Sequence, residues 1–184
     1  VSRGPAKQPL IKRKLMCTLE ELFTGCTKRI KITRKKLNAD GRTTRMEEKI
    51  LEIKVKAGWK AGTTITFPNE GDEGPGTVPA DIAFVIGEKA HPRFVREGND
   101  LVHTARVSLK DALTDCSVDI KTLDGRTLSV PINEVISPGY RKVVGGEGMP
   151  VSKTGERGNL VLKFEIVFPT YISEDRRAAL RTLL

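Results

Sequence analysis

Basic and apolar residues alternate in two segments of the chain in a way that suits binding of an acidic peptide. Successive side chains of a strand point to opposite faces, so every second residue shares a face. Two such strips occur, one with Lys28, Ile30 and Ile32 and one with Lys49, Leu51 and Ile53. An apolar strip that ends in an ammonium group can bury alternate side chains of an extended peptide and bind a carboxylate. A plain sheet core explains the same apolar residues, so both interpretations stay open.

Residues typical of catalysis are scarce. The two histidines, His91 and His103, do not form a His-x-x-x-His pair. No glycine-rich phosphate-binding loop and no Gly-x-Ser-x-Gly nucleophile motif is present. The glycine-rich segment 71–76 follows no strand–helix–strand pattern and is interpreted as a loop. We therefore expect a protein that is not an enzyme and that has no cofactor.

The three cysteines, Cys17, Cys26 and Cys116, do not form a Cys-x-x-Cys pair. An odd number at these spacings argues against a disulfide framework and against a zinc site. Cys26 and Cys116 are interpreted as small buried residues. No metal site is predicted.

The net charge of +9 favours an acidic partner but does not identify its class. Basic clusters at 12–14 and 34–36 make a nucleic-acid-binding module the alternative to peptide binding. Aromatic residues make up only 5% of the chain, whereas single-strand binders stack bases on exposed rings, so nucleic acid is the less favoured partner. The chain also lacks an apolar run long enough for a membrane helix and an apolar leader segment, so we expect a soluble intracellular protein with no membrane partner.

The sequence contains two similar halves, and this indicates how the binding residues are positioned. Paired motifs occur in the same order in both halves, and the first half has the longer loops between them: Thr18–Cys26 with Ser108–Cys116, Asp40–Thr43 with Asp124–Thr127, Gly58–Trp59 with Gly139–Tyr140, and Glu70–Gly71 with Glu147–Gly148. A unit of roughly eighty residues is long enough for a small domain. The duplication therefore predicts two homologous domains in tandem.

Alternating apolar residues predict mainly antiparallel strands in both halves. These strands cover 28–34, 49–56, 63–67, 82–86, 116–122, 127–132 and 160–168, and short helical turns are expected at 18–23 and 108–113. The predicted fold is mainly β, with two tandem homologous small β-sandwich domains followed by a C-terminal helix. The predicted boundaries are a linker end at 1–9, domain I at 10–90, domain II at 91–170 and the helix at 171–184.

The C-terminal helix is predicted to mediate dimerisation. Ser173 is a suitable N-cap, and acidic residues follow it in the first turn. Leu180, Leu183 and Leu184 fall on one side and provide an apolar face for a second copy. A purely structural dimerisation unit is therefore a third functional possibility.

Several spaced motifs together resemble the C-terminal substrate-binding region of DnaJ-type J-domain proteins, the heat-shock 40-kDa family. These motifs are Leu15–Lys28, Gly58–Thr63, His91–Phe94, Leu123–Thr127, Gly145–Pro150 and Arg157–Leu160. The resemblance covers nearly all of residues 10–184. The zinc-binding repeats of the first subclass are missing, so the chain resembles the zinc-free second subclass (type II, class B). His91-Pro92 is followed by Arg93 instead of the aspartate of a J-domain motif, so we expect no stimulation of a partner ATPase by this chain alone.

The resemblance implies a co-chaperone region in which domain I binds unfolded client segments and the acidic Glu-Glu-Val-Asp tail of the seventy-kilodalton heat-shock chaperone. Matching the motifs strand by strand places Leu15, Ile30, Ile32, Leu51 and Phe84 at apolar groove positions. It places Lys28 at a tail-binding position, with Arg29 and Lys49 as additional basic contacts. Arg13 departs from the pattern, in which an apolar residue is usual. A homodimer located in the cytoplasm, with the nucleus as a second location, is the expected assembly.

Overall fold

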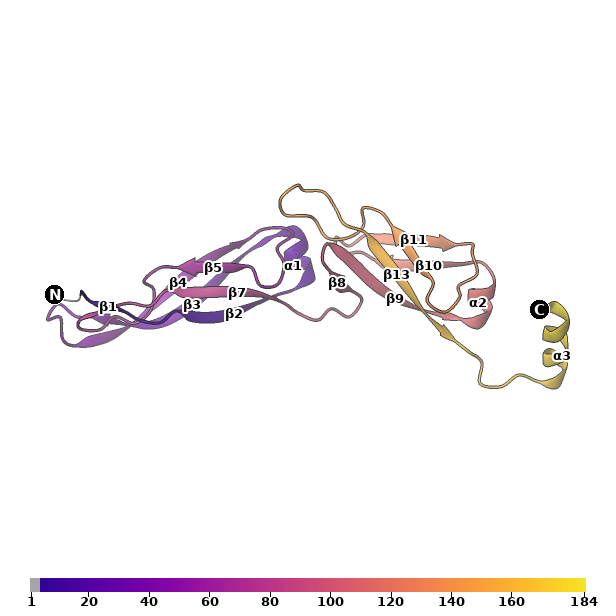
Figure 1. Ribbon diagram of the computed structural model, residues 1–184, viewed down its shortest axis with the longest axis horizontal. Coiled ribbons are helices and arrows are strands. Elements are labelled where there is room, and N and C mark those ends of the chain that lie inside the picture. Colours follow the sequence, from indigo (N-terminus) through magenta and orange to yellow (C-terminus); the bar gives the residue numbers. More distant parts are fainter. Residues whose placement is uncertain (1–3) are drawn as a thin grey trace. The chain divides into compact units, whose positions relative to one another are not determined.

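The protein, a computed structural model that describes residues 4–184, is divided into two compact units (Figure 1). One contains the residues up to Pro92 together with Met149–Arg157, and the other contains Arg93–Gly148 and Gly158–Leu184. Residues 1–3 of the predicted linker end lie outside the described part. The hairpin Met149–Arg157 thus belongs in space to the first unit, where the Arg157 guanidinium lies 4.7 Å from the centroid of the Phe23 ring.

The first unit is built from two main sheets. Its elements are β1 (Ala6–Lys7), β2 (Ile11–Cys17), α1 (Leu19–Thr24), β3 (Cys26–Leu37), β4 (Thr44–Val55), β5 (Thr64–Phe67), β6 (Thr77–Val78) and β7 (Ile82–Glu88). One sheet has the strand order β2-β7-β5, and the other is the long hairpin β3-β4. The short pair β1-β6 ties the start of the chain to this unit, where Lys7 Nζ also lies 2.8 Å from Asp81 Oδ1.

The second unit repeats this arrangement with shorter connections. Its elements are β8 (Val95–Glu97), β9 (Asp100–Ser108), α2 (Leu109–Leu113), β10 (Cys116–Lys121), β11 (Thr127–Ile132), β12 (Arg141–Val144), β13 (Leu160–Val167) and α3 (Glu174–Leu183). Strand β13 lies between β9 and β12 as β7 lies between β2 and β5, and the hairpin β10-β11 corresponds to β3-β4. The predicted fold class, with two homologous β-units and a final helix, is therefore confirmed.

Most strand pairs are antiparallel, as predicted, but the first and last main strands of each unit pair in parallel. Leu15 pairs with Ile86 in the β2-β7 ladder, and Val102 pairs with Val161 in the β9-β13 ladder. A tight hairpin forces its two strands to run in opposite directions, whereas these strands are joined through a helix and a hairpin that carry the chain back to its starting end. Strand β7, the middle strand of its sheet, is buried on both faces along most of its length, whereas β13 has exposed residues in its second half.

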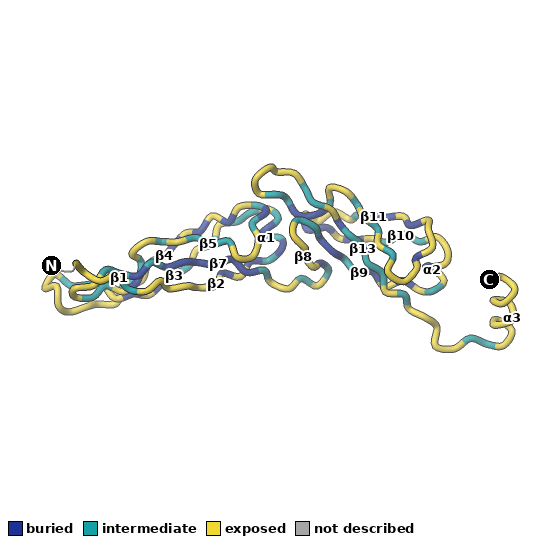
Figure 2. The backbone as a smooth tube through the Cα atoms, viewed as in Figure 1, coloured by how far each residue is buried: buried dark blue, intermediate teal, exposed yellow. Residues whose placement is uncertain are grey.

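Each unit has its own set of buried apolar residues, and Figure 2 shows buried residues in dark blue in both units. In the first unit Leu22, Ile53 and Ile86 are at most 1% exposed. In the second unit the α2 residue Ala112 packs with Val107, Ile132 and Ile136, so the helix, the sheet and the hairpin share one core. Packing of two sheets around each core is the physical basis of the β-sandwich.

The helix ends follow capping rules that are visible in the sequence. Thr18 accepts a hydrogen bond from the Glu21 amide at 3.1 Å, and Ser108 accepts one from the Asp111 amide at the same distance. Ser173 is the N-cap of α3, as predicted, and accepts from the Arg176 amide. Among the described residues, no helix has the length and apolar character needed to cross a membrane.

Cys17, Cys26 and Cys116 are free thiols in the structure. Cys17 is fully buried, whereas Cys26 and Cys116 are only half-buried, so the prediction that the repeated pair is buried is wrong. Burial nevertheless raises the pKa of all three thiols, which keeps them in the neutral form.

Candidate functional site

Lys28 lies near the start of β3 and pairs with a carboxylate that is supplied by α1. Its Nζ is 2.7 Å from Glu21 Oε2, and the two side chains are 23% and 28% exposed. The hydrogen bond that Lys28 donates to Glu21 raises the pKa of Lys28 although partial burial lowers it. Lys28 is therefore a charged ammonium group that remains within reach of a ligand from solvent.

Glu21 is held in place independently of Lys28. Its Oε1 accepts a hydrogen bond from the Thr18 backbone amide at 3.0 Å, which completes a capping box at the start of α1. Burial raises the pKa of this carboxyl, but hydrogen bonds from Lys28 and Thr18 outweigh that effect and lower the pKa to about 2. Glu21 is therefore ionised at all physiological pH values.

The second basic residue of the predicted site, Lys49, belongs to a different ion-pair cluster. Its Nζ lies 2.7 Å from Glu70 Oε1, and the other oxygen of Glu70 accepts a hydrogen bond from the buried Arg34. Partial burial raises the pKa of Glu70, but Lys49 and Arg34 together hold it below its usual value. Lys28 lies opposite Ile53 in the β3-β4 ladder, whereas Lys49 lies opposite Ile32. The two lysines also pair with different carboxylates, Glu21 and Glu70.

The apolar residues assigned to a groove lie mainly in the core of the first unit. Leu15, Ile32, Leu51 and Phe84 are 7%, 2%, 4% and 2% exposed. Ile30 is half-buried and is the member of this set with the most accessible surface. The peptide-binding assignment of these residues stays a prediction, but their burial makes core packing their evident structural role.

The backbone of β3 offers an open strand edge beside Lys28. Along a strand of an antiparallel ladder, the backbone N–H and C=O groups of one residue bond to the partner strand, and those of the next residue point away from it. The Lys35 amide and carbonyl bond away from β4, to the side chain of Asp72 and the amide of Glu73, both at 2.8 Å. By the same alternation, Arg29, Lys31 and Thr33 point their backbone groups outward, and within residues 4–184 these groups have no hydrogen-bond partner beyond the ladder.

The loop that carries Asp72 and Glu73 closes the far end of this edge. Glu73 Oε2 accepts the Leu37 amide at 3.0 Å, and Glu73 Oε1 lies 2.8 Å from Lys36 Nζ. The loop therefore occupies the edge from Lys35 onward. The edge available to another chain extends from Thr27 to Thr33, with Lys28 near its beginning.

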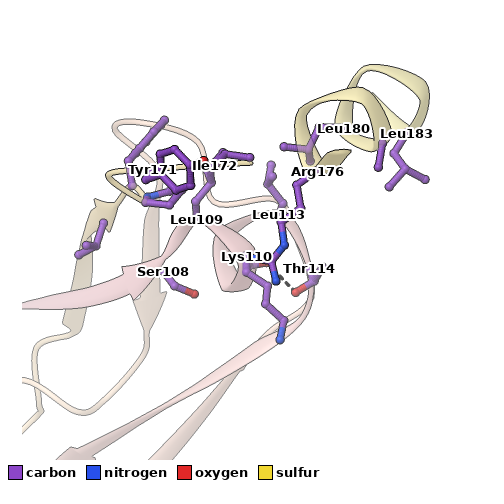
Figure 3. Close-up of a pocket in the computed structure, with 14 residues that line it drawn as sticks. Ser108, Leu109, Lys110, Leu113, Thr114, Tyr171, Ile172, Arg176, Leu180 and Leu183 are labelled. Atoms are coloured by element: carbon purple, nitrogen blue, oxygen red, sulfur yellow. Dashed lines mark hydrogen bonds between the residues drawn. The ribbon is translucent and has the colours of Figure 1, made fainter. Parts of the chain in front are cut away.

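A second candidate surface lies in the other unit, beside the C-terminal helix. A cavity of about 720 Å³ lies between α2, the end of β13 and α3, and its lining is almost entirely apolar (Figure 3). Leu113, Tyr171, Leu180 and Leu183 all contribute to the lining, and Tyr171 and Leu183 are 80% and 79% exposed. Helix α3 has no buried residue, and Leu184 is 87% exposed. This surface is incompletely packed by the chain itself.

Sequence reasoning did not identify the acidic partners of the basic residues. Glu21 is visible in the sequence as the last residue of a capping box, but that pattern gives no indication of its contact with Lys28. Glu70, Asp72 and Glu73 lie in a loop that has no periodic pattern and that meets β3 only in the folded chain.

Comparison of the chain with known proteins identifies its family. Residues 11–169 match the DnaJ C terminal domain. The chain is 48% identical over 184 residues to DnaJ homolog subfamily B member 13 of Homo sapiens, covering 99% of this chain and 58% of that protein. It is 46% identical to DnaJ homolog subfamily B member 5 of Homo sapiens, covering 98% of this chain and 56% of the relative.

A more distant relative shows the same pattern of coverage. Protein SIS1 of Saccharomyces cerevisiae is 37% identical over 176 residues, which cover 95% of this chain and 49% of the yeast protein. The chain thus spans about half the length of the curated relatives that it matches. The match extends over both β-units and their connecting segments, and the chain belongs to the DnaJ C terminal domain family.

Proposed function

We propose that this chain is the peptide-binding and dimerisation region of a co-chaperone that assists protein folding. It binds unfolded client segments and the acidic C-terminal tail of a seventy-kilodalton heat-shock chaperone. The observation that carries the proposal is the open edge of β3 between Thr27 and Thr33 with the Lys28 ammonium near its beginning. Membership of the DnaJ C terminal domain family supports the chaperone role.

An open strand edge suits client segments of varied sequence. A peptide that adds to the edge as a further strand gains main-chain hydrogen bonds whatever its side chains are. Arg29, Lys31 and Thr33 supply outward-pointing amides and carbonyls for such pairing, and Ile30 supplies a half-buried apolar contact. Lys28 then favours peptides that present a carboxylate at this end of the edge. The same edge therefore serves clients and the acidic tail.

The charge of the peptide is expected to determine its affinity. A peptide that ends in Glu-Glu-Val-Asp should bind at least about tenfold more tightly than the matched peptide Gln-Gln-Val-Asn with an amidated end, because a charge-assisted hydrogen bond contributes about 1.5–3 kcal/mol. Titration of both peptides by calorimetry measures the difference.

The alternative nucleic-acid role is tested in the same experiment with a single-stranded oligonucleotide as competitor. The cluster 12–14 on β2 is exposed and would carry such binding. Equal affinity for the two peptides would contradict the proposal. Tight, salt-dependent oligonucleotide binding that displaces the acidic peptide would favour nucleic acid instead.

The dimer is proposed to form through α3 and the neighbouring cavity. Each chain has exposed leucines at the end of α3 and an apolar cavity beside this helix. In a twofold arrangement, the leucines of each copy can therefore fill the cavity of the other. The highly exposed Tyr171, Leu183 and Leu184 would then be covered. A second copy of this chain is therefore the occupant that we assign to the cavity.

We also propose the cytoplasm, with the nucleus as a second location, as the site of action.

Substitution Leu183→Asp is expected to weaken the dimer by at least about tenfold, because it places a charge in an apolar interface. Folding should be unaffected since Leu183 is 79% exposed. Sedimentation equilibrium measures the change, and Val135→Asp is the matched control because Val135 is 58% exposed and does not line the cavity. A wild-type chain that stays monomeric at high concentration would refute the dimer, and equal effects of both variants would refute this surface.

A further inference from the structure

The lysine assigned to the ligand carboxylate already holds a carboxylate of its own chain. We propose that Glu21 is a built-in competitor that limits the affinity of the Lys28 site for acidic peptides and keeps their binding readily reversible. This inference rests on the proposed function, because it concerns the same site. It assigns a regulatory role to a side chain that also caps α1 and accepts a hydrogen bond from the Cys26 thiol.

The geometry separates the two tasks of Glu21. Oε1 accepts a hydrogen bond from the Thr18 amide, whereas Oε2 accepts one from Lys28 and one, at 3.5 Å, from the Cys26 thiol, so one oxygen serves the cap and the other the lysine. The cap fixes the carboxylate on α1 next to Lys28 whether or not a ligand is present. A ligand carboxylate therefore cannot simply replace Glu21; it must share the ammonium group with a negative charge that stays close by.

Other cations along this part of β3 are also matched by carboxylates. Arg29 Nε lies 3.9 Å from Glu52 Oε2, and Lys31 Nζ lies 2.9 Å from Glu48 Oε2. These two pairs are well exposed and screened by solvent, whereas the pair of Lys28 and Glu21 is partly shielded. Despite the net charge of +9, the local charge at the edge is close to balanced, and Glu21 is the least exposed of the three carboxylates.

A positioning role for Glu21 makes the opposite prediction. If Glu21 were needed to orient Lys28, its loss would weaken ligand binding. The Lys28 side chain is 23% exposed, so the ammonium group can donate to solvent or ligand while it remains bonded to Glu21. An ammonium group has three donors, which makes sharing possible. The sign of the change in affinity therefore distinguishes competition from positioning.

The test is Glu21→Gln in the full chain, titrated with the Glu-Glu-Val-Asp peptide. Glutamine serves at this capping-box position as glutamate does, so α1 keeps its cap while the negative charge is lost. The dissociation constant should fall about three- to tenfold, by the size expected for a partly shielded ion pair. Because the Glu21 pKa is about 2, the substitution, rather than acidification, is the way to remove this charge.

Glu48→Gln is the matched control. It removes one negative charge from the β3-β4 hairpin that carries Lys28, but from an exposed pair with Lys31. Its effect on affinity should stay below about twofold. Circular dichroism of both variants checks that the helix and the sheets are intact.

The outcomes separate this inference from the proposed function. If the wild type does not distinguish the acidic peptide from its uncharged counterpart, the proposed function fails. If the wild type prefers the acidic peptide but Glu21→Gln binds it equally or more weakly, the competitor role is overturned and the proposed function stands. An equal gain in peptide affinity in Glu48→Gln would also overturn the competitor role, because removing any nearby negative charge would then have the same effect.

Discussion

Replacing Phe84 with alanine is expected to lower the free energy of unfolding of the first unit by about 3–5 kcal/mol, the usual cost of removing a buried aromatic ring. Phe84 is 2% exposed in the central strand β7, and its ring meets Phe67 edge-on with centroids 5.8 Å apart. The single tryptophan, Trp59, lies in the same unit, so its fluorescence during denaturant titration reports the unfolding of this unit.

The matched control for this change is Ile50→Ala. Ile50 is a large apolar residue of the same unit but is 64% exposed, so its loss should change the unfolding free energy by no more than about 0.5 kcal/mol. A Phe84→Ala chain that is as stable as wild type but binds peptide weakly would contradict the core assignment. It would show instead that Phe84 faces a ligand, as its match to the family groove implied.

Replacing Lys28 with alanine is expected to raise the dissociation constant for the Glu-Glu-Val-Asp peptide by at least about tenfold. The variant removes the ammonium donor and leaves the Glu21 carboxylate, which then repels the ligand. Calorimetric titration of the acidic peptide measures the change. The uncharged Gln-Gln-Val-Asn peptide should bind wild type and variant nearly equally, because it makes no charge-assisted bond to Lys28.

Lys31→Ala provides the comparison on the same strand. Lys31 is exposed on the outer face of β3 and pairs with Glu48, so its loss should change affinity by less than about twofold. The stability of Lys28→Ala should fall only slightly because Glu21 keeps its hydrogen bond to Thr18. Equal losses in the two variants would show that general positive charge, and not the Lys28 contact, attracts the peptide.

Burial distinguishes residues that alternation alone groups together. Lys28, Ile30 and Ile32 share a face of β3, as their spacing predicted, but the accessible surface decreases along this face from Lys28 to Ile32. The spacing therefore identified the correct face. It did not show that the same face enters the core after Ile30, because burial depends on the sheet that packs against it.

The duplication was the most reliable source of structural prediction. Each copy contains its own capped turn, hairpin and final strand, and each of these depends on residues close in sequence. The spatial assignment of Met149–Arg157 was not apparent, since this hairpin lies within the second copy but belongs to the first unit. Gly58 permits that close approach: its φ is +89°, and a side chain there would collide with the Pro150 carbonyl.

The sequence by itself determined the two-unit β-fold, the short helices with their capping residues, the face on which Lys28 lies and many of the strands, but not β2, β9 and β12. These features follow from local turn and cap chemistry and from periodic alternation, which are properties of neighbouring residues. Only the tertiary structure decided that β2 pairs with β7 and β9 with β13 in parallel, that Phe84 is core, and that Glu21 is the partner of Lys28. Strand partners, burial and ion pairs depend on which segments meet after folding, and periodicity carries no information about what covers a face.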